Sequence, residues 1–493
     1  MQKSIKFILD GEKVKISINH PYHGFTPTTT LLDFLRSQTK RKGVKEGCSQ
    51  GDCGACTVVL AEPGEDGKLI YKAVNSCLVF LPMVHGKQVI TIENLSIPGP
   101  SGLELHPVQQ ALLEHHGIQC GFCTPGMVMS LFVLFKNYSN PSLETVKDAL
   151  TGNLCRCTGY QSIVQAALSA CNQGSRDHFS IDEDRVVGIL NDILENRDML
   201  EINDDRQRYL KPFLLWSALK YLKMLPEATI FNGATDVALR QTQKGAFLKV
   251  LLDLSSVKEL RYFREEEDRY RIGAGLTIEE LKKATAGKLP AFHQMLQRFG
   301  SLQIRNLATL GGNLAGASPI GDTIPLLLAY KASVQLSTIT ASREIGIDKF
   351  LKGYHQTDLQ PDELITEIVV PKTDGETKIA AYKVSKRNEL DISTVSAAFR
   401  LKLKGNKVSE IILAFGGMAQ LTIRAKKTER FVTGKVWSRS LVEGARHILD
   451  QEMTPISDAR AEASFRISVA KNLLLKFYLE NKSFNDTGKS ELP

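Results

Sequence analysis

Eight of the nine cysteines in this chain fall into two tight groups. They are Cys48, Cys53, Cys56 and Cys77 in the first group, and Cys120, Cys123, Cys155 and Cys157 in the second. Four thiolates that are close in sequence are typical of a metal centre. The sequence therefore predicts two four-thiolate metal sites. The ninth cysteine, Cys171, has no partner left, and we expect it to be a small buried hydrophobe.

The first group has the spacing C-x4-C-x2-C followed by a later cysteine, which is how plant-type ferredoxins bind a [2Fe-2S] cluster. From Glu46 to Cys56 the cysteines alternate with small residues, so the backbone can fold close around inorganic sulfides and point N–H groups at them. We expect a loop to supply three thiolates and a later strand the fourth. A structural zinc site is the alternative, although its usual signature is two C-x2-C knuckles.

The second group is less diagnostic, since C-x2-C pairs serve zinc, redox disulfides and iron alike. Apolar periodicity predicts helices over 105–113 and 125–135, a third opened by Asn140-Pro141, and a fourth after Gly159. A thioredoxin-like site would need a preceding strand and a βαβ frame. We expect these cysteines to lie at turns between four helices and to converge on one buried metal site.

Three motifs carry a family resemblance: EGCxxGDCGAC over 46–56, LHPVQ with QCGFCTPG over 105–126, and GNLCRCTGY over 152–160. In this wording the region resembles the iron–sulfur part of molybdenum hydroxylases, the family of xanthine dehydrogenases and aldehyde oxidases. The resemblance implies a β-grasp ferredoxin-like domain over 1–88 and a four-helix domain over 89–172. Each would hold one [2Fe-2S] cluster, and all eight ligands are present.

A length of 493 residues suggests three or four domains, and 43% hydrophobic residues is ordinary for a soluble globular chain. Residues 5–16 predict a strand, an Asp-Gly turn and a second strand rather than a signal peptide, and no membrane span is expected. Reduced thiolates fit a reducing compartment, so we expect a cytoplasmic protein. Residues 173–208 are polar and acid-rich and predict an interdomain linker, with one helix around 186–194.

The net charge is +8, yet Lys and Arg are scattered, and the densest patch is Lys40-Arg41-Lys42. This pattern favours a solvated face over a nucleic-acid surface. No internal repeat is present.

Beyond residue 208 two glycine-containing turns carry the functional signal. An apolar strand runs into the turn 232–236, where backbone N–H groups could approach a pyrophosphate. In the segment 306–322, Gly311-Gly312-Asn313 permits close backbone approach. Taken alone, each turn is a weak signal for cofactor binding, because a glycine turn after a strand is most often only a connection. The stretch 271–278 begins like G-x-G-x-x-G but has Ile278 in place of the third glycine, so we expect a strand end leading into a helix over 277–283.

Together, GxTD and TLGGNLAxASPIGD resemble the FAD-binding domain of the same family. The resemblance implies an α+β multidomain fold, with a PCMH/VAO-like FAD-binding domain over 209–380 and a C-terminal α/β flavoprotein domain of the CO dehydrogenase type over 381–493. It also implies a set of FAD contacts, in which Thr309 and Ile365 differ conservatively from the family pattern. The implied FAD contacts are Ile230, Phe231, Asn232, Gly233, Ala234, Thr235, Asp236, Val237, Phe299, Thr309, Gly312, Asn313, Asp322, Ile365 and Lys383.

For function, the resemblance implies the iron–sulfur/FAD subunit of an NAD-dependent xanthine dehydrogenase, which converts hypoxanthine and xanthine to urate. Electrons would pass from molybdenum through the two clusters to FAD and then to NAD. Because the chain ends at Pro493, we expect the molybdopterin cofactor and the hydroxylation residues on a large partner subunit, in a dimer of heterodimers. Gln119 matches the glutamine that touches the partner's molybdopterin.

Two alternatives stay open. The chain could serve an aldehyde or N-heterocycle hydroxylase, or it could be a zinc-stapled binding module. No cysteine follows Cys171, which removes the extra [4Fe-4S] cluster that some relatives carry in their flavin part.

Overall fold

The computed structural model describes residues 2–18, 24–100, 102–172, 176–195 and 199–482, and the predicted polar tail from Ser483 lies outside them. The chain forms two compact units. Unit one is Met1–Glu259 with Gly300–Thr309, and unit two is Leu260–Phe299 with Leu310–Pro493. Unit one thus holds both predicted cluster domains together with the first part of the predicted FAD domain.

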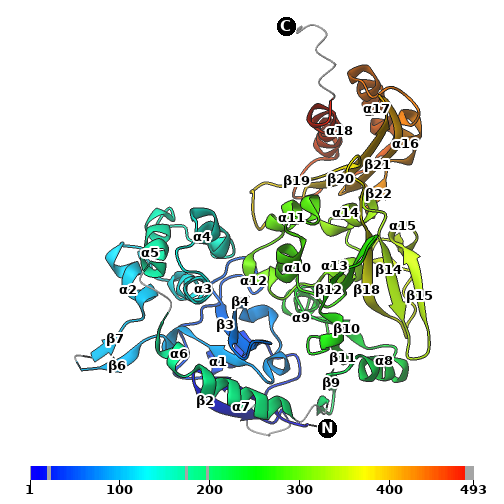
Figure 1. The fold of residues 1–493 in the computed structure, drawn as a ribbon. Helices are drawn as coiled ribbons and strands as arrows, with labels where there is room; N and C mark the ends of the chain where they lie inside the picture. Colours follow the sequence, from blue (N-terminus) through cyan, green and yellow to red (C-terminus); the bar gives the residue numbers. More distant parts are fainter. Residues whose placement is uncertain (1, 19–23, 101, 173–175, 196–198, 483–493) are drawn as a thin grey trace. The chain divides into compact units, whose positions relative to one another are not determined.

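Unit one begins with a five-stranded mixed sheet in the order β2-β1-β5-β3-β4, with one parallel pair, β1 and β5. Figure 1 labels three of these strands, β2, β3 and β4. Asp10 and Gly11 form the predicted turn between the first two strands, both in the left-handed region with φ of 49° and 84°. This sheet with its helix is the predicted ferredoxin-like fold. Its elements are β1 (Ile5–Leu9), β2 (Glu12–Ile16), α1 (Leu31–Ser37), β3 (Thr57–Pro63), β4 (Leu69–Asn75) and β5 (Gln88–Ile90).

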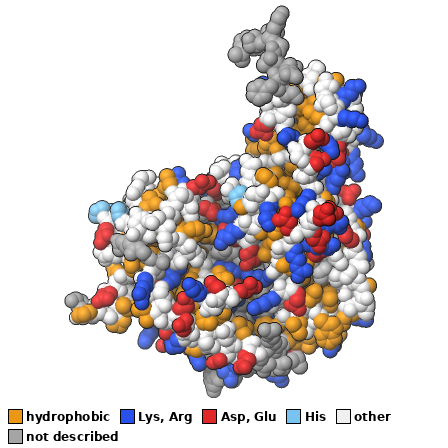
Figure 2. Space-filling model, viewed as in Figure 1, with side chains coloured by type: hydrophobic (Ala, Val, Ile, Leu, Met, Phe, Trp, Pro, Cys, Tyr) orange, Lys and Arg blue, Asp and Glu red, His pale blue; other side chains and the backbone are white. Residues whose placement is uncertain are grey.

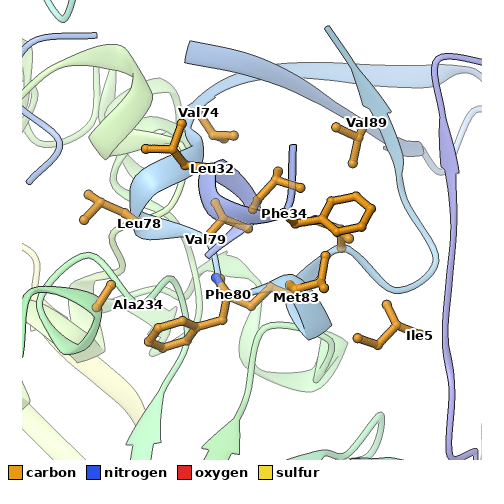
Figure 3. Close-up of a cluster of buried hydrophobic side chains, with 14 of the residues drawn as sticks. Ile5, Leu32, Phe34, Val74, Leu78, Val79, Phe80, Met83, Val89 and Ala234 are labelled. Carbon is orange, nitrogen blue, oxygen red and sulfur yellow. The ribbon is translucent and has the colours of Figure 1, made fainter. Parts of the chain in front are cut away.

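The core of this sheet is an apolar cluster (Figure 3). Phe34 of α1 and Val74 of β4 are buried there together with Phe80. Ala234, from the predicted FAD turn, belongs to the same cluster, and the ring centroids of Phe80 and Phe231 lie 5.9 Å apart. Each such side chain contributes about 1.5–3 kcal/mol by leaving water. The turn after residue 231 is therefore anchored on the ferredoxin-like core.

The four helices predicted around the second cysteine group are all present. The second of them is buried on nearly every side and packs against β3 and β4, because its sequence is apolar around the whole circumference. A short hairpin precedes the helices. The elements are β6 (Ile97–Gly99), β7 (Gly102–Glu104), α2 (Pro107–Glu114), α3 (Thr124–Asn137), α4 (Leu143–Leu150) and α5 (Gln161–Cys171).

The stretch predicted as a linker differs from that expectation in its described residues. Helix α7 (Glu183–Glu195) packs against β1 and β3 through buried Val186 and Leu190, which confirms the one helix expected there. The acidic residues Asp184, Asp192 and Glu195 of this helix lie on its exposed face. From residue 200 the chain already belongs to a four-stranded sheet in the order β10-β11-β9-β8. The elements are α6 (His178–Ile181), α7, β8 (Leu200–Asp204), β9 (Gln207–Lys211), α8 (Leu215–Met224), β10 (Thr229–Phe231), α9 (Val237–Thr242), β11 (Val250–Asp253) and α12 (Leu302–Arg305).

The described residues of unit two form two larger antiparallel sheets and one separate two-stranded antiparallel ribbon, β16-β17. The first has the order β12-β13-β18-β14-β15, and as predicted β13 ends in a loop that leads to a helix capped by Thr277. Its elements are β12 (Phe263–Glu265), β13 (Arg269–Gly273), α10 (Ile278–Thr285), α11 (Pro290–Gln297), α13 (Leu310–Ala315), α14 (Thr323–Ala329), β14 (Ser333–Ser337), β15 (Ser342–Gly346), α15 (Ile347–Phe350), β16 (Leu351–Gly353), β17 (Gln356–Thr357) and β18 (Leu364–Pro371).

The second sheet of unit two has the order β19-β20-β21-β22, and its helices bury Phe399, Phe415 and Phe477 in a common cluster. Its elements are β19 (Lys378–Val384), β20 (Val395–Lys404), β21 (Lys407–Gly416), β22 (Ile423–Arg424), α16 (Lys426–Val432), α17 (Arg439–Glu452) and α18 (Ala463–Glu480). Among the described residues, no helix combines the length and apolar character that crossing a membrane requires. On the face drawn in Figure 2, Lys and Arg are interspersed with Asp and Glu.

Candidate cluster and flavin sites

The first cysteine group lies at one end of the ferredoxin-like sheet. Cys48, Cys53 and Cys56 belong to the loop before β3, as predicted, but Cys77 is not on a strand. It lies in a single 3-10 turn, Ser76–Leu78, directly after β4. The Sγ atoms of Cys56 and Cys77 are 3.3 Å apart, and these residues are only 2% and 1% exposed. Cys48 and Cys53 form a second, half-buried pair, in which the Cys53 N–H donates to Cys48 Sγ over 3.4 Å.

Each of these pairs contains one thiol that ionises easily. A hydrogen bond from the Cys53 thiol lowers the pKa of Cys48 to about 5, while the same hydrogen bond and burial raise the pKa of Cys53. In the buried pair, the hydrogen bond with Cys77 lowers the pKa of Cys56, and that of Cys77 is raised. Thiolates are the metal-binding form of cysteine, so each pair is prepared to bind a cation.

The backbone of this loop requires small residues. Gly51 and Gly54 have φ of 84° and 69°, in the left-handed region that glycine adopts without strain. A Cβ atom on Gly47 would lie 2.9 Å from Cys53 Sγ. The N–H of Gln50 points at Cys48 Sγ over 3.5 Å. The loop thus folds closely around its thiols, as the small residues between the cysteines predict.

The second group also forms two pairs, at the N-terminal ends of α3 and α5. The free thiol of Cys123 interacts with that of Cys155, and the free thiol of Cys157 with that of Cys120, and each interaction shifts a thiol pKa. Burial, then the interaction with Cys155, raises the pKa of Cys123 to about 12. Burial alone would raise the pKa of Cys155, but hydrogen bonds from Thr158 outweigh it and lower that pKa. Cys120 and Cys157 are exposed, so the prediction of a wholly buried site is wrong for this half.

The arrangement of the thiols in pairs indicates which kind of metal centre the two sites suit. Among the residues that the structure describes, no three His, Cys, Asp or Glu side chains converge as a ready site for a single metal ion. The eight thiols instead lie as four pairs. A cluster with two irons takes two thiolates on each iron, so two pairs per site suit [2Fe-2S] better than one tetrahedral zinc.

In unit one, the predicted FAD residues 230–237 run from the end of β10, which holds Ile230 and Phe231, through the turn 232–236 to Val237 at the start of α9. The three parallel strands β9, β11 and β10 end at the same edge. A Cβ atom on Gly233 would lie 1.7 Å from the Leu307 carbonyl oxygen, and Ala234 is left-handed with φ of 59°, so the turn has little room for other residues. Thr309 is buried in the same unit.

At that edge the structure also shows a buried ion pair that no motif or periodicity predicts. Lys211 Nζ donates to Asp253 Oδ2 over 2.7 Å, and Tyr209 Oη donates to the same oxygen over 2.6 Å. All three side chains are fully buried at the ends of β9 and β11. Because these residues are far apart in the chain, no local sequence pattern predicts the contact.

In unit two, the structure brings two of the predicted FAD residues together. Lys383 Nζ donates to Asp322 Oδ2 over 2.7 Å, and Ser393 Oγ, which was not predicted, donates to Oδ1 over 2.5 Å. Asn313 Oδ1 accepts a hydrogen bond from Thr323 Oγ1 over 2.6 Å. Asp322 and Lys383 are buried, so these bonds fix their orientation.

The remaining predicted FAD residues of unit two are more dispersed. Ile365 lies buried on β18, and Phe299 is half-buried just after α11. The expected turn at Gly311-Gly312-Asn313 is wrong, because these residues lie in helix α13. Gly311 is still constrained, since its Cβ atom would lie 2.7 Å from the Ala274 carbonyl oxygen.

Four known sequence families match consecutive parts of the chain. "2Fe-2S iron-sulfur cluster binding domain" matches residues 19–81, and "[2Fe-2S] binding domain" matches 91–168. "FAD binding domain in molybdopterin dehydrogenase" matches 202–373, and "CO dehydrogenase flavoprotein C-terminal domain" matches 380–481.

Among similar proteins, xanthine dehydrogenase of Emericella nidulans is 31% identical over 99% of this chain and 39% of its own length. Aldehyde oxidase 1 of Bos taurus is 29% identical over 92% of this chain and 38% of its own length. The chain therefore spans about two fifths of these relatives. A solved chain of carbon monoxide dehydrogenase from Hydrogenophaga pseudoflava is 26% identical, with a TM-score of 0.53 over 56% of this chain and 96% of that chain.

The four families match successive parts of the chain, and the two [2Fe-2S] families cover the two groups of paired thiols. The chain belongs to the molybdenum hydroxylase family, in which it corresponds to the iron–sulfur and FAD-binding part.

Proposed function

We propose that this chain relays electrons within an NAD-dependent xanthine dehydrogenase. When bound, the two clusters carry single electrons from a molybdenum centre, and FAD collects two of them and transfers a hydride to NAD. The observation that supports this relay best is the arrangement of the eight thiols as four pairs, within two domains that match [2Fe-2S] families.

The chain's own residues would prepare each cluster site. Cys48 and Cys56, with lowered pKa values, offer thiolates to the first cluster, and Cys155 does so for the second. The Gln50 and Thr158 N–H groups point at ligand sulfurs over 3.5 Å each. Hydrogen bonds to sulfur and exclusion of solvent are the means by which a protein sets the reduction potential of such a cluster.

The exposed edge of the second site is the surface we assign to a molybdenum-cofactor-binding partner. Gln119 is exposed immediately before Cys120. The apolar side chains of Phe122 and Leu154, next to ligand cysteines in sequence, are 49% and 41% exposed. Apolar residues around an exposed ligand pair suit burial against another protein. Gln119 would then reach the partner's molybdopterin.

For FAD we propose the residues inferred from the resemblance. The 230–237 turn offers backbone N–H groups to the phosphates. Lys383 and Asp322, held by their ion pair and by Ser393, would present fixed polar groups to the flavin.

The identities of the substrate and of the electron acceptor are the most specific parts of the proposal. Xanthine rests on the xanthine dehydrogenases among the similar proteins. An aldehyde substrate is the second candidate, because aldehyde oxidases match to a similar extent.

The test is anaerobic purification of the full chain with its co-expressed molybdenum partner, followed by cofactor analysis and an assay with xanthine and NAD. We expect about four irons and one FAD per chain, with NADH formed only when xanthine is present. The same cofactors with turnover of an aldehyde instead would retain the relay and change the substrate. Zinc without flavin would refute the proposal.

A further inference from the structure

A buried amide lies between the two cluster loops. Asn153, in the GNLCRCTGY motif, is 2% exposed. Its Nδ2 donates to the Gly54 carbonyl oxygen over 3.1 Å and to Thr57 Oγ1 over 3.2 Å. Its Oδ1 accepts from Ser130 Oγ over 2.6 Å and from Gln303 Nε2 over 2.8 Å. Both donors and both acceptor positions of the side chain are therefore used.

These partners fix which way the amide points. Gln303 Nε2 also donates to Ser130 Oγ over 3.0 Å, so Ser130 must give its own proton to Asn153 Oδ1. Rotating the Asn153 amide by half a turn would bring its NH₂ group against these two donors. Ser130 and Gln303 are themselves fully buried, where such a mismatch would be costly.

The main chain around Asn153 continues the contact to both ligand sets. The next N–H, of Leu154, donates to the carbonyl oxygen of the first-cluster ligand Cys53 over 3.0 Å. The second-cluster ligand Cys155 donates its N–H to Tyr160 Oη over 2.7 Å, and Tyr160 Oη donates to the Asn153 carbonyl oxygen over 3.3 Å.

The two loops touch here with no space for side chains. A Cβ atom on Gly54 would lie 2.1 Å from the Gly152 carbonyl oxygen, and one on Gly126 would lie 2.2 Å from the Gly54 carbonyl oxygen. Backbone therefore packs directly on backbone, and the Asn153 side chain supplies polar contacts that keep these segments in register.

From these contacts we propose that Asn153, supported by Ser130 and Gln303, is a positioning residue for electron exchange between the two clusters. It ligates no metal. It fixes the separation of the Cys53–Cys56 loop from the Cys155–Cys157 loop, and electron tunnelling depends steeply on separation. This inference rests on the proposed binding of both clusters.

The test is Asn153→Asp in the full chain, purified anaerobically with its clusters. The carboxylate keeps the side chain's size and its acceptor toward Ser130 and Gln303, but it places an oxygen against Gly54 and Thr57 in place of two donors. After one-electron pulse reduction, we expect the rate of redistribution between the clusters to fall at least about tenfold, the range for loss of groups that orient ligands. Iron and sulfide contents should be unchanged.

Asn306→Asp is the matched control. Asn306 is also a buried asparagine of unit one, and its Nδ2 donates to the Ala73 carbonyl oxygen over 2.9 Å, with no bond to either cluster loop. The substitution Asn306→Asp introduces the same charge as Asn153→Asp. We expect the rate of electron redistribution between the clusters to stay within about twofold of the wild type, because the contacts of Asn153 are unchanged. If Asn153→Asp fails to fold, Ser130→Ala, which removes one donor to Asn153 Oδ1, should slow exchange in the same direction.

An unchanged rate in Asn153→Asp, or in Ser130→Ala where that variant decides, would overturn the inference, as would an equal fall in Asn306→Asp. Failure of the proposed function looks different. In that case the wild-type chain itself would lack two distinct [2Fe-2S] signals, and the inference would fall with it.

Discussion

The two cysteine groups lie in regions that are built in different ways. Cys56 and Cys77 belong to the apolar core of the ferredoxin-like sheet, whereas Cys120 and Cys157 are exposed at helix ends. Solvent exposure is one of the factors that set cluster potentials. In the proposed relay, this difference suits the exposed site to exchange with a partner and the buried site to transfer inside the chain.

The regions also differ in what stabilises them. The ferredoxin-like sheet depends on burial of apolar side chains such as Phe34 and Phe80 (Figure 3). The helical region adds a buried ionic cluster. Asp177 accepts from Lys136 Nζ over 2.8 Å, and its other oxygen lies 3.1 Å from His106 Nε2. The same task, holding two thiol pairs in place, is thus achieved by apolar packing in one region and partly by charge in the other.

The largest expected effect is the loss of one cluster when a ligand cysteine of either site is replaced. Cys77→Ser and Cys157→Ser should each remove one cluster, lowering iron from about four to about two per chain. Only Cys77→Ser should also destabilise the metal-free fold, by about 1–3 kcal/mol, because it replaces a thiol of the apolar core with a more polar hydroxyl. Iron analysis and urea unfolding would check this. Cys171→Ala is the control and should keep all iron; equal destabilisation by both serines would contradict the comparison.

After the loss of a whole cluster, the ionic cluster offers the largest expected effect on the free energy of unfolding. Asp177→Asn leaves Lys136 buried without its carboxylate, and we expect a loss of about 3–5 kcal/mol in the free energy of unfolding. Asp182→Asn, which breaks the exposed pair with Arg185, should cost less than about 1 kcal/mol. Urea titration of both variants measures the difference. Similar values would show that charge does not support the helical region.

The same carboxyl predicts a pH dependence. Burial alone would raise the pKa of Asp177, but hydrogen bonds from His106 and Lys136 outweigh it and hold the pKa below its usual 3.8. A lowered folded pKa contributes stability that is complete above the unfolded pKa and is lost as the pH falls. Wild-type stability should therefore drop below about pH 4 more steeply than that of Asp177→Asn. Parallel curves would refute this role.

In the metal-free chain, the pH dependence of thiol alkylation should differ between the two regions. Cys48 and Cys123 are both half-buried, but the pKa of Cys48 is lowered to about 5 and that of Cys123 is raised to about 12. Because the thiolate is the nucleophile, alkylation of Cys48 should be nearly constant from about pH 6.5 to about pH 8.5. Alkylation of Cys123 should rise about tenfold per pH unit. Mass spectrometry of the modified peptides would distinguish them, and matching pH profiles would contradict the assigned pKa values.

Local signals in the sequence predicted much of this architecture. The Asp-Gly hairpin, the four helices around the second cysteine group and the strand that ends at Gly273 follow from turn chemistry and periodicity, which act over a few residues. The linker prediction failed from residue 200 because the polar, acid-rich run 203–205 was weighed above the alternating apolar residues Leu200 and Ile202, which are buried in β8. Cys77 was placed on a strand that in fact ends two residues earlier.

Contacts between distant segments could not be predicted in this way. Lys211 with Asp253, and Asn153 with Gln303, join residues far apart in the chain, so no periodicity or motif relates them. Ser393 shows the same limit, since only the fold brings it to Asp322. The exposure of Cys120 and Cys157 also depends on how the helices end, which spacing does not encode.

The smallest expected effect compares one helix cap from each region. Thr30 Oγ1 accepts from the Asp33 N–H over 3.1 Å at the start of α1, and Ser142 Oγ accepts from the Thr145 N–H over 3.1 Å at the start of α4. Replacement of either by alanine should cost about 1 kcal/mol. Thr30→Ala should cost more, because Thr30 is buried and also donates to Asp33 Oδ2, whereas Ser142 is exposed and water can replace its bond. Urea unfolding of both variants would measure the order, and a larger loss for Ser142→Ala would mean that burial does not govern the strength of these caps.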